Sequence, residues 1–245
     1  MSAAPILQVD RLSKNFRGLA AIADVSFAIE PGSITSIIGP NGAGKSTLFN
    51  LVTGYLPPSA GAIQFQGRPI TGLATNRIAE LGIARAFQIA RPFRDLSVFD
   101  NVRIGALFGK TGTRDVAATT ARGMELAAIA HLADQPASSL TVGQLRHLEV
   151  ARAIATRADL LLADEPCAGL NPTETAAMIE VLRRIRSSGV TVVLVEHDMP
   201  SVMEVSDRLL VLDAGRLIAD GPPHTVAQDS KVIAAYLGTP DVADT

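Results

Sequence analysis

The chain has 245 residues, of which 47% are hydrophobic and 4% aromatic, so it can bury one large α/β core, or two small ones, built mostly from aliphatic side chains. Its 22 basic and 24 acidic residues give a net charge of −2. This balance offers no broad basic surface for free nucleic acid, and no nucleic-acid partner is expected. One cysteine, Cys167, excludes an intrachain disulfide and fits the reducing cytoplasm. The first 14 residues do not match a secretory signal, and no apolar run approaches the ~18–20 residues that span a bilayer.

The first predicted elements flank a glycine-rich segment. Residues 24–29 alternate between apolar and polar side chains, as a half-buried strand does. Residues 33–38 form an apolar, β-branched strand that leads directly into Gly39, and a helical pattern follows the glycines. Residues 54–72 are rich in glycine and proline, which indicates turns around a short strand at 62–66.

The middle of the chain has a helical character. Ser97 stands at a predicted helix start with capping-box spacing, and residues 116–133 are rich in alanine and predicted to be helical. Apolar side chains follow one helical stripe through residues 144–155. We therefore expect residues 89–156 to form a helical subdomain.

The α/β pattern returns in the last part of the chain. Residues 160–163 and 190–195 are continuous apolar runs, which a buried parallel sheet requires of its strands. Between them, Asn171 stands as the N-cap of a helix with proline at its first position. Residues 208–212 and 217–219 are predicted to pair as a hairpin. The chain 1–245 is thus expected to be a single domain, with an α/β body (1–88 and 157–245) and the inserted subdomain.

The strongest functional motif is Gly39–Ser46, which matches the pattern G-x-x-x-x-G-K-[ST]. Its glycines let backbone N–H groups turn toward phosphate oxygens, and the helix that follows adds its positive end. Lys45 supplies a charge for the β- and γ-phosphates, and the Ser46 hydroxyl can bind Mg²⁺. The alternative, a glycine-rich turn without a ligand, does not explain the strand before it and the helix after it. We expect ATP to be bound by Gly39, Pro40, Asn41, Gly42, Ala43, Gly44, Lys45, Ser46 and Thr47.

Acidic side chains follow the two apolar strands of the last third. Asp164 and Glu165 end the first strand, where acids at the carboxyl end of a parallel strand face the ligand crevice. Asp164 is a candidate Mg²⁺ ligand and Glu165 a candidate general base. The alternative is a solvated acidic turn. His197 leaves the second strand nearby and is a candidate partner of the γ-phosphate, although a lone histidine is more often structural.

These pieces together resemble a known family. Leu140-Thr141-Val142-Gly143-Gln144, followed by residues 148–153, resembles the signature motif of ABC transporter ATPases. The order also fits that family: the phosphate loop, then Gln88, the signature, Asp164-Glu165-Pro166 and His197. The resemblance implies a P-loop NTPase fold of the ABC ATPase kind, with a mostly parallel core sheet, N-terminal antiparallel strands and an inserted helical subdomain.

The resemblance also implies a paired mechanism. Two ATPase subunits would pair head to tail, so that Thr141, Gly143 and Gln144 of one meet the ATP that is bound by the other. Gln88 would contact Mg²⁺ and the attacking water. Phe16 is similar to the family's aromatic residue that stacks on adenine; the alternative is a core phenylalanine in a short loop.

Four further segments narrow the resemblance to the ATP-binding subunits of bacterial branched-chain amino-acid importers: residues 84–88, 168–172, 196–199 and 234–238. This implies transport of branched-chain or other hydrophobic amino acids, with a second ATPase subunit, integral-membrane permease subunits and, indirectly, a periplasmic binding protein as partners. The chain would be cytoplasmic, peripheral on the inner face of the cell membrane. Val142 departs from the small or aromatic residue usual in the signature.

Two other functions stay open at this point. One is a soluble ABC ATPase that acts on DNA or ribosomes. The other is a nucleotide-binding regulatory module with weak hydrolysis, which the altered signature at Val142 permits and the intact Lys45, Asp164, Glu165 and His197 oppose.

Overall fold

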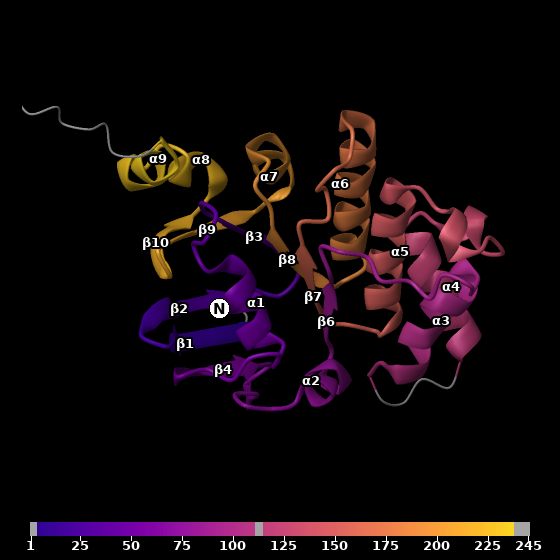
Figure 1. The fold of residues 1–245 in the computed structure, drawn as a ribbon, viewed down its shortest axis with the longest axis horizontal. Coiled ribbons are helices and arrows are strands. Elements are labelled where there is room, and N and C mark those ends of the chain that lie inside the picture. The colour runs from indigo at the N-terminus through magenta and orange to yellow at the C-terminus, as the bar shows by residue number, and fades with distance from the viewer. Residues whose placement is uncertain (1–3, 111–114, 238–245) are drawn as a thin grey trace, which may run out of the picture.

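The computed structural model describes residues 4–110 and 115–237, arranged as two sheets with helices around them (Figure 1). The strands are β1 (Leu7–Phe16), β2 (Leu19–Ile29), β3 (Ile34–Ile38), β4 (Ala60–Phe65), β5 (Arg68–Pro69), β6 (Ile83–Ala86), β7 (Leu160–Asp164), β8 (Thr191–Val195), β9 (Arg208–Asp213) and β10 (Arg216–Gly221). The α-helices are α1 (Lys45–Val52), α2 (Thr75–Leu81), α3 (Val98–Phe108), α4 (Val116–Leu126), α5 (Val142–Ala155), α6 (Pro172–Ser187), α7 (Met199–Val205), α8 (Pro223–Val226) and α9 (Ser230–Leu237).

The central sheet has six strands in the order β10-β9-β3-β8-β7-β6, parallel throughout except for the β9–β10 hairpin. Every residue of β3, β7 and β8 is buried, which agrees with their continuous apolar runs. Ile37 pairs with Val195, and Asp164 pairs with the same residue from the other side. The carboxyl ends of these three strands therefore lie side by side at one edge of the sheet.

A second, antiparallel sheet has the order β2-β1-β4-β5 and packs its apolar face against α1. This confirms the expected N-terminal antiparallel strands, but β1 itself was not predicted. Its alternation breaks because the register shifts between Val9 and Leu12, and Arg11 between them has a φ of 45°. The extra residue moves Leu12 back to the buried face, so simple period-two counting fails.

Helices α3, α4 and α5 stand together beyond β6 (Figure 1), and their apolar side chains share one core with β7. The predicted cap at Ser97 is confirmed, because its Oγ accepts the Asp100 N–H at 3.0 Å. The segment 116–133 predicted to be helical is so only in two pieces: α4 ends at Leu126, Ala128 has a left-handed φ of 55°, and a separate 3₁₀ turn follows. Alanine richness favours helix without indicating where it stops.

The C-terminal part covers the other end of the sheet. The predicted hairpin is confirmed as β9 and β10, and α7, α8 and α9 lie beside it (Figure 1). Val226 and Val232 pack with Ile38, the last residue of β3, in a small separate core. Gly238, which ends one of the segments with family resemblance, lies outside the described residues. Within the described ranges, no helix is long and apolar enough to cross a membrane.

Candidate functional site

The loop between β3 and α1 contains two glycines, Gly39 and Gly44, at which a side chain would meet the backbone of other segments. Gly39 has a φ of 148°, and a Cβ there would lie 2.0 Å from the Leu212 carbonyl oxygen. Gly44 has a φ of 105°, and its Cβ would lie 2.6 Å from the Ala21 carbonyl oxygen. Because Gly44 is the N-cap of α1 and brings no side-chain cap, the start of the helix is open to an anion.

Lys45 is buried beside this loop. Its Nζ donates to the carbonyl oxygens of Gly39, at 2.6 Å, and Pro40, at 3.0 Å. Burial lowers the pKa of Lys45 below its ordinary value, and the negative charges of Glu165 and Asp164 act in the opposite direction. The ammonium group and the two acids therefore belong to one electrostatic site, as the sequence predicts.

The acids turn into this site at the end of β7. Glu165 has a left-handed φ of 48°, and its N–H donates to the Val195 carbonyl at 2.9 Å, so the chain leaves the sheet sharply. Gln88 Nε2 donates to Glu165 Oε2 at 2.5 Å, and His197 Nδ1 lies 3.8 Å from the same oxygen. Gln88 and His197, from separate parts of the chain, thus both lie at the Glu165 carboxylate.

Next to His197 lies Glu196, to which the sequence analysis assigned no role of its own. Its side chain is 1% exposed, and its carboxylate accepts N–H groups from Cys167, at 2.8 Å, and His197, at 3.3 Å. Burial raises the pKa of Glu196. Asp198 caps α7, and hydrogen bonds from Ser201 lower the pKa of Asp198. These two acids fix the backbone on either side of His197.

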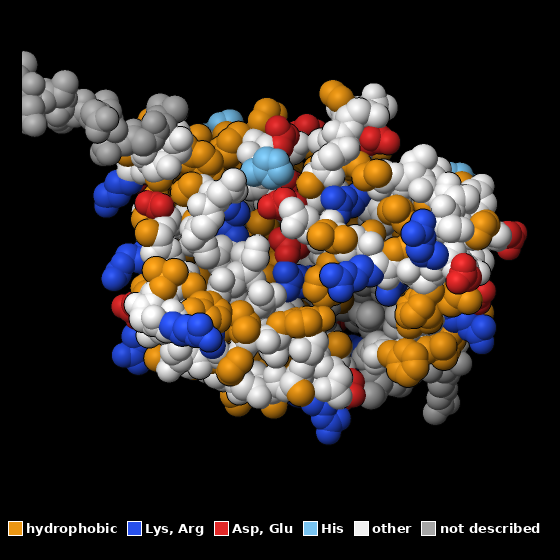
Figure 2. Space-filling model, in the orientation of Figure 1, with side chains coloured by type: hydrophobic (Ala, Val, Ile, Leu, Met, Phe, Trp, Pro, Cys, Tyr) orange, Lys and Arg blue, Asp and Glu red, His pale blue; other side chains and the backbone are white. Residues whose placement is uncertain are grey.

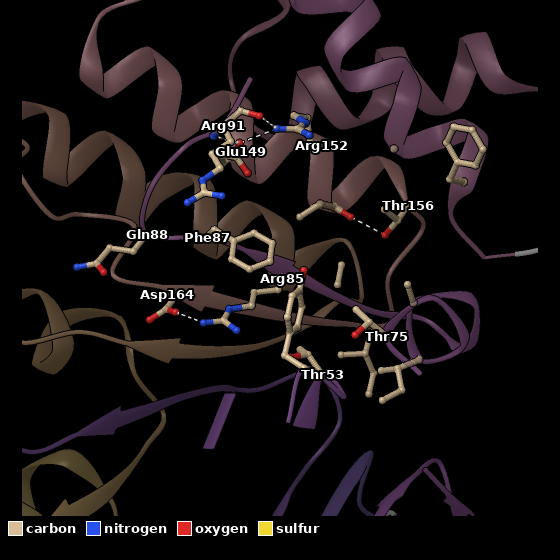
Figure 3. Close-up of a pocket in the computed structure, with 18 of the residues that line it drawn as sticks. Thr53, Thr75, Arg85, Phe87, Gln88, Arg91, Glu149, Arg152, Thr156 and Asp164 are labelled. Atoms are coloured by element: carbon tan, nitrogen blue, oxygen red, sulfur yellow. Dashed lines mark hydrogen bonds and ion pairs between the residues drawn. The ribbon is translucent and has the colours of Figure 1, made fainter. Parts of the chain in front are cut away.

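The sequence also missed the partner of Asp164. Arg85, at the end of β6, donates from Nη2 to Asp164 Oδ2 at 2.5 Å (Figure 3). Both side chains line a cavity of about 700 Å³, together with Ser46 and Gln88. In Figure 3, Phe87 lies beside the Arg85 guanidinium, and Arg91, Glu149 and Arg152 lie across the cavity from them. The pair joins residues 79 positions apart, a contact that no local motif indicates.

The signature residues Thr141–Gln144 form the start of α5. Thr141 Oγ1 accepts the Gln144 N–H at 3.3 Å, and Gln144 Oε1 accepts the Thr141 N–H at 2.9 Å, a complete capping box. A Cβ on Gly143 would lie 2.8 Å from Glu174 Oε1, and Val142 is 58% exposed. Among the residues that the structure describes, no hydrogen bond links this helix start to loop 39–47.

Phe16 ends β1 opposite Leu19, at the tip of a hairpin whose Ala21 carbonyl faces Gly44. It is 42% exposed, with Lys14 Nζ 5.1 Å from the ring centre. The alternative of a core phenylalanine in a short loop is therefore wrong, and the ring is free to contact a ligand.

Comparison with known proteins decides the family. A family model described as "ABC transporter" matches residues 22–168, from β2 to just beyond the acids. The chain belongs to the ABC transporter family. A second model, described as "Branched-chain amino acid ATP-binding cassette transporter", matches residues 216–242, from β10 to beyond α9. The structural class expected from the sequence, an ABC ATPase, is confirmed, and this ABC protein is an ATPase subunit.

Relatives of this ABC ATPase match over almost the whole chain. The high-affinity branched-chain amino acid transport ATP-binding protein BraF of Pseudomonas aeruginosa is 39% identical, over 96% of this chain and 98% of the relative. LivG of Escherichia coli K12, a protein with the same description, is 37% identical over the same shares. A solved ATP-binding cassette of an ABC transporter, in its ADP conformation, superposes with a TM-score of 0.87 at 30% identity and covers 97% of this chain and 100% of its own.

Proposed function

We propose that this ATPase energises an importer of branched-chain or other hydrophobic amino acids. The observation that carries the proposal is the match of residues 216–242 to the branched-chain cassette model, in addition to relatives whose names specify branched-chain amino acid transport. A soluble ABC ATPase that acts on DNA or ribosomes is disfavoured, because nothing in that function calls for this C-terminal match. The ordered group around Glu165 opposes a regulatory module with weak hydrolysis.

In this proposal, loop 39–47 binds the triphosphate through its backbone N–H groups and the start of α1. Lys45 provides a positive charge already held at the loop by two carbonyls. Phe16, exposed at the hairpin tip, stacks on adenine. The conformation of Gly39 and Gly44 supports this role, since side chains there would obstruct the loop.

The residues present fit a Mg²⁺ ion that accompanies ATP. Ser46 and Asp164 line one cavity and offer oxygen atoms, which Mg²⁺ prefers, and Gln88 lies beside them as a further contact. When bound there with ATP, the ion would neutralise charge on the β- and γ-phosphates. Asp164 contributes as a ligand, directly or through water.

Hydrolysis is assigned to the group around one carboxylate. Glu165 takes a proton from the attacking water as general base, Gln88 holds the carboxylate and water in line, and His197 donates a hydrogen bond to the γ-phosphate. Glu196 and Asp198 keep the His197 backbone in place. Gln88 and His197 both lie near Glu165 Oε2, so the base and the two side chains that would orient the water and the γ-phosphate are held together in the site.

The site is completed by a second ATPase subunit, either a copy of this chain or a paralogue. Thr141, Gly143 and Gln144 of the partner's α5 would close over the γ-phosphate, because the helix start is exposed at Val142. A fold relative at 22% identity was solved as a dimer bound to ADP and Pi, which supports the pairing of two ATPase subunits in this proposal.

The membrane partners fit the face around the cavity. Two exposed apolar side chains, Ile89 and Phe108, lie at its rim, and Figure 2 shows apolar side chains over the region of α3. We assign this rim to the integral-membrane permeases, with a periplasmic binding protein delivering the solute to them. The chain then acts in the cytoplasm, peripheral on the inner face of the membrane.

The Glu165→Gln variant tests the hydrolytic assignment. It keeps the size and a hydrogen-bonding oxygen but cannot act as a base, so ATP turnover should fall by about 10²–10⁴-fold while the ATP affinity of the monomeric subunit stays within two-fold. Phosphate release and equilibrium binding of labelled ATP measure the two quantities. Turnover at the native rate would show that Glu165 is not the base. The identity of the solute is tested separately, by uptake of leucine into vesicles that carry the assembled transporter.

A further inference from the structure

Arg85 and Asp164 form a buried ion pair next to the proposed metal site. Their side chains are 9% and 7% exposed, and Nη2 lies 2.5 Å from Oδ2. A buried pair is costly to desolvate and is weak evidence of stability alone, so its presence calls for a specific reason. The hydrogen bond from Arg85 Nη2 uses the Oδ2 atom of Asp164.

The second arm of Arg85 reaches a different element. Nη1 donates to Asn50 Oδ1, on α1, at 2.7 Å. Helix α1 also carries Ser46, and β7 ends in Asp164, so the guanidinium spans the two elements that supply the proposed protein ligands of Mg²⁺. A planar fork with two fixed N–H directions sets the separation of its two acceptors, which a single flexible ammonium does not.

Aromatic rings hold the fork in its plane. The guanidinium carbon lies 4.8 Å from the Phe87 ring centre and 5.6 Å from that of Phe49. Figure 3 shows Phe87 beside Arg85, one residue before Gln88. The Arg85 Nε is buried and makes no hydrogen bond to any described residue, so the two Nη arms and the rings alone fix the orientation.

We propose that Arg85 is a positioning residue of the metal site, which fixes the Asp164 carboxylate relative to Ser46 so that both meet one Mg²⁺ ion. This inference rests on the proposed function of Asp164 and Ser46 as metal ligands. Arg85 acts through Asp164 and Asn50 and touches neither nucleotide nor metal. Because α1 and β7 come from distant parts of the sequence, the fork is the direct side-chain link between them at this point.

The test compares Arg85→Met with the native full-length chain. Binding of a non-hydrolysable ATP analogue is measured in EDTA and then across a Mg²⁺ titration. We expect affinity in EDTA to change less than two-fold, whereas the Mg²⁺ concentration for half-maximal tightening rises about ten-fold. Asn50→Leu removes the acceptor of Arg85 Nη1 and should raise this Mg²⁺ concentration less. Arg77→Met, at an exposed arginine, should leave it unchanged. Arg85→Lys keeps the positive charge without the planar fork. If it raises the Mg²⁺ concentration for half-maximal tightening nearly as much as Arg85→Met does, the role of Arg85 lies in placing Asp164 and not in its charge.

A double-mutant cycle separates placement from folding. In the Asp164→Asn background, Arg85→Met should have no further effect on the Mg²⁺ titration, since both changes act on one carboxylate. An unchanged Mg²⁺ titration in Arg85→Met, or an equal loss of ATP-analogue affinity with and without Mg²⁺, overturns the proposed role of Arg85 without affecting the assignment of Asp164 as a metal ligand. If Asp164→Asn itself leaves the titration unchanged, the metal assignment fails first. Should Arg85→Met not fold, Arg85→Lys replaces it in the same cycle, with the same outcomes for and against the role of Arg85.

Discussion

At the scale of single residues, Lys45 shows how the loop and the acids depend on one another. Its ammonium is held by two loop carbonyls on one side and attracted by Glu165 and Asp164 on the other. Burial lowers the pKa of Lys45, and the two acids act against that effect. The charge is thereby already placed where the triphosphate would arrive.

Lys45→Ala should weaken ATP binding by about ten- to a hundred-fold. The change removes a charged hydrogen-bond donor, worth about 1.5–3 kcal/mol, and leaves the Gly39 and Pro40 carbonyls without it. Equilibrium binding of fluorescent ATP measures the effect. Lys45→Arg keeps the charge and should bind more tightly than the alanine variant; unchanged affinity in Lys45→Ala would contradict the phosphate-loop assignment.

At the scale of elements, α6 follows the acids of β7 along the chain and is fixed by its cap and by its packing on the sheet. Asn171 Oδ1 accepts the Glu174 N–H at 3.0 Å, and Glu174 Oε2 accepts the Asn171 N–H at 3.0 Å. The helix buries Met178, Leu182 and Ile185 against the sheet. A Cβ on Gly143 would lie 2.8 Å from Glu174 Oε1, so the first turn of α6 packs closely against the start of α5.

Asn171→Ala should lower the free energy of unfolding by about 1 kcal/mol, because the first N–H groups of α6 lose their cap. Urea denaturation measures the change. Asn171→Asp retains the accepting oxygen and adds a negative charge at the helix start, so it should stay near the native value. Thr173→Ala, at an exposed position in the same turn, is the matched control; a loss as large as that of Asn171→Ala would show that the cap is not the cause.

The elements that the sequence predicts well are those with local signals. Strands β3, β7 and β8 are buried on both faces, so their runs are unambiguous, and the caps at Ser97 and Asn171 lie in three-residue patterns. The register shift in β1 and the end of α4 at Leu126 depend on tertiary packing. Likewise the phosphate loop is a contiguous motif, whereas the fork of Arg85 joins residues 35 and 79 positions away and leaves no local trace.

At the scale of the whole molecule, the site is open on one face. Figure 2 shows acidic, basic and histidine side chains gathered near the centre of that face. The signature residues lie on α5 without a hydrogen bond to loop 39–47 in the described part of the chain, although the proposed function requires both at one γ-phosphate. A second subunit would meet this requirement, since in two copies related head to tail the α5 start of each would lie over the ATP bound by the other.

ATP should therefore drive dimer formation in Glu165→Gln, because the shared nucleotide persists when hydrolysis stops. Analytical ultracentrifugation with and without ATP measures it, and Lys45→Ala in the same background should stay monomeric.

Val142→Glu places a negative charge at the exposed start of α5, where it would face the partner's phosphates. It should weaken the dimer at least about ten-fold, since like charges across an interface cost several kcal/mol, while ATP binding to the monomer stays within two-fold. Ala117→Glu adds the same charge on the exposed surface of α4 and should leave the dimer intact. An ATP-dependent dimer equally strong with Val142→Glu would place the interface elsewhere.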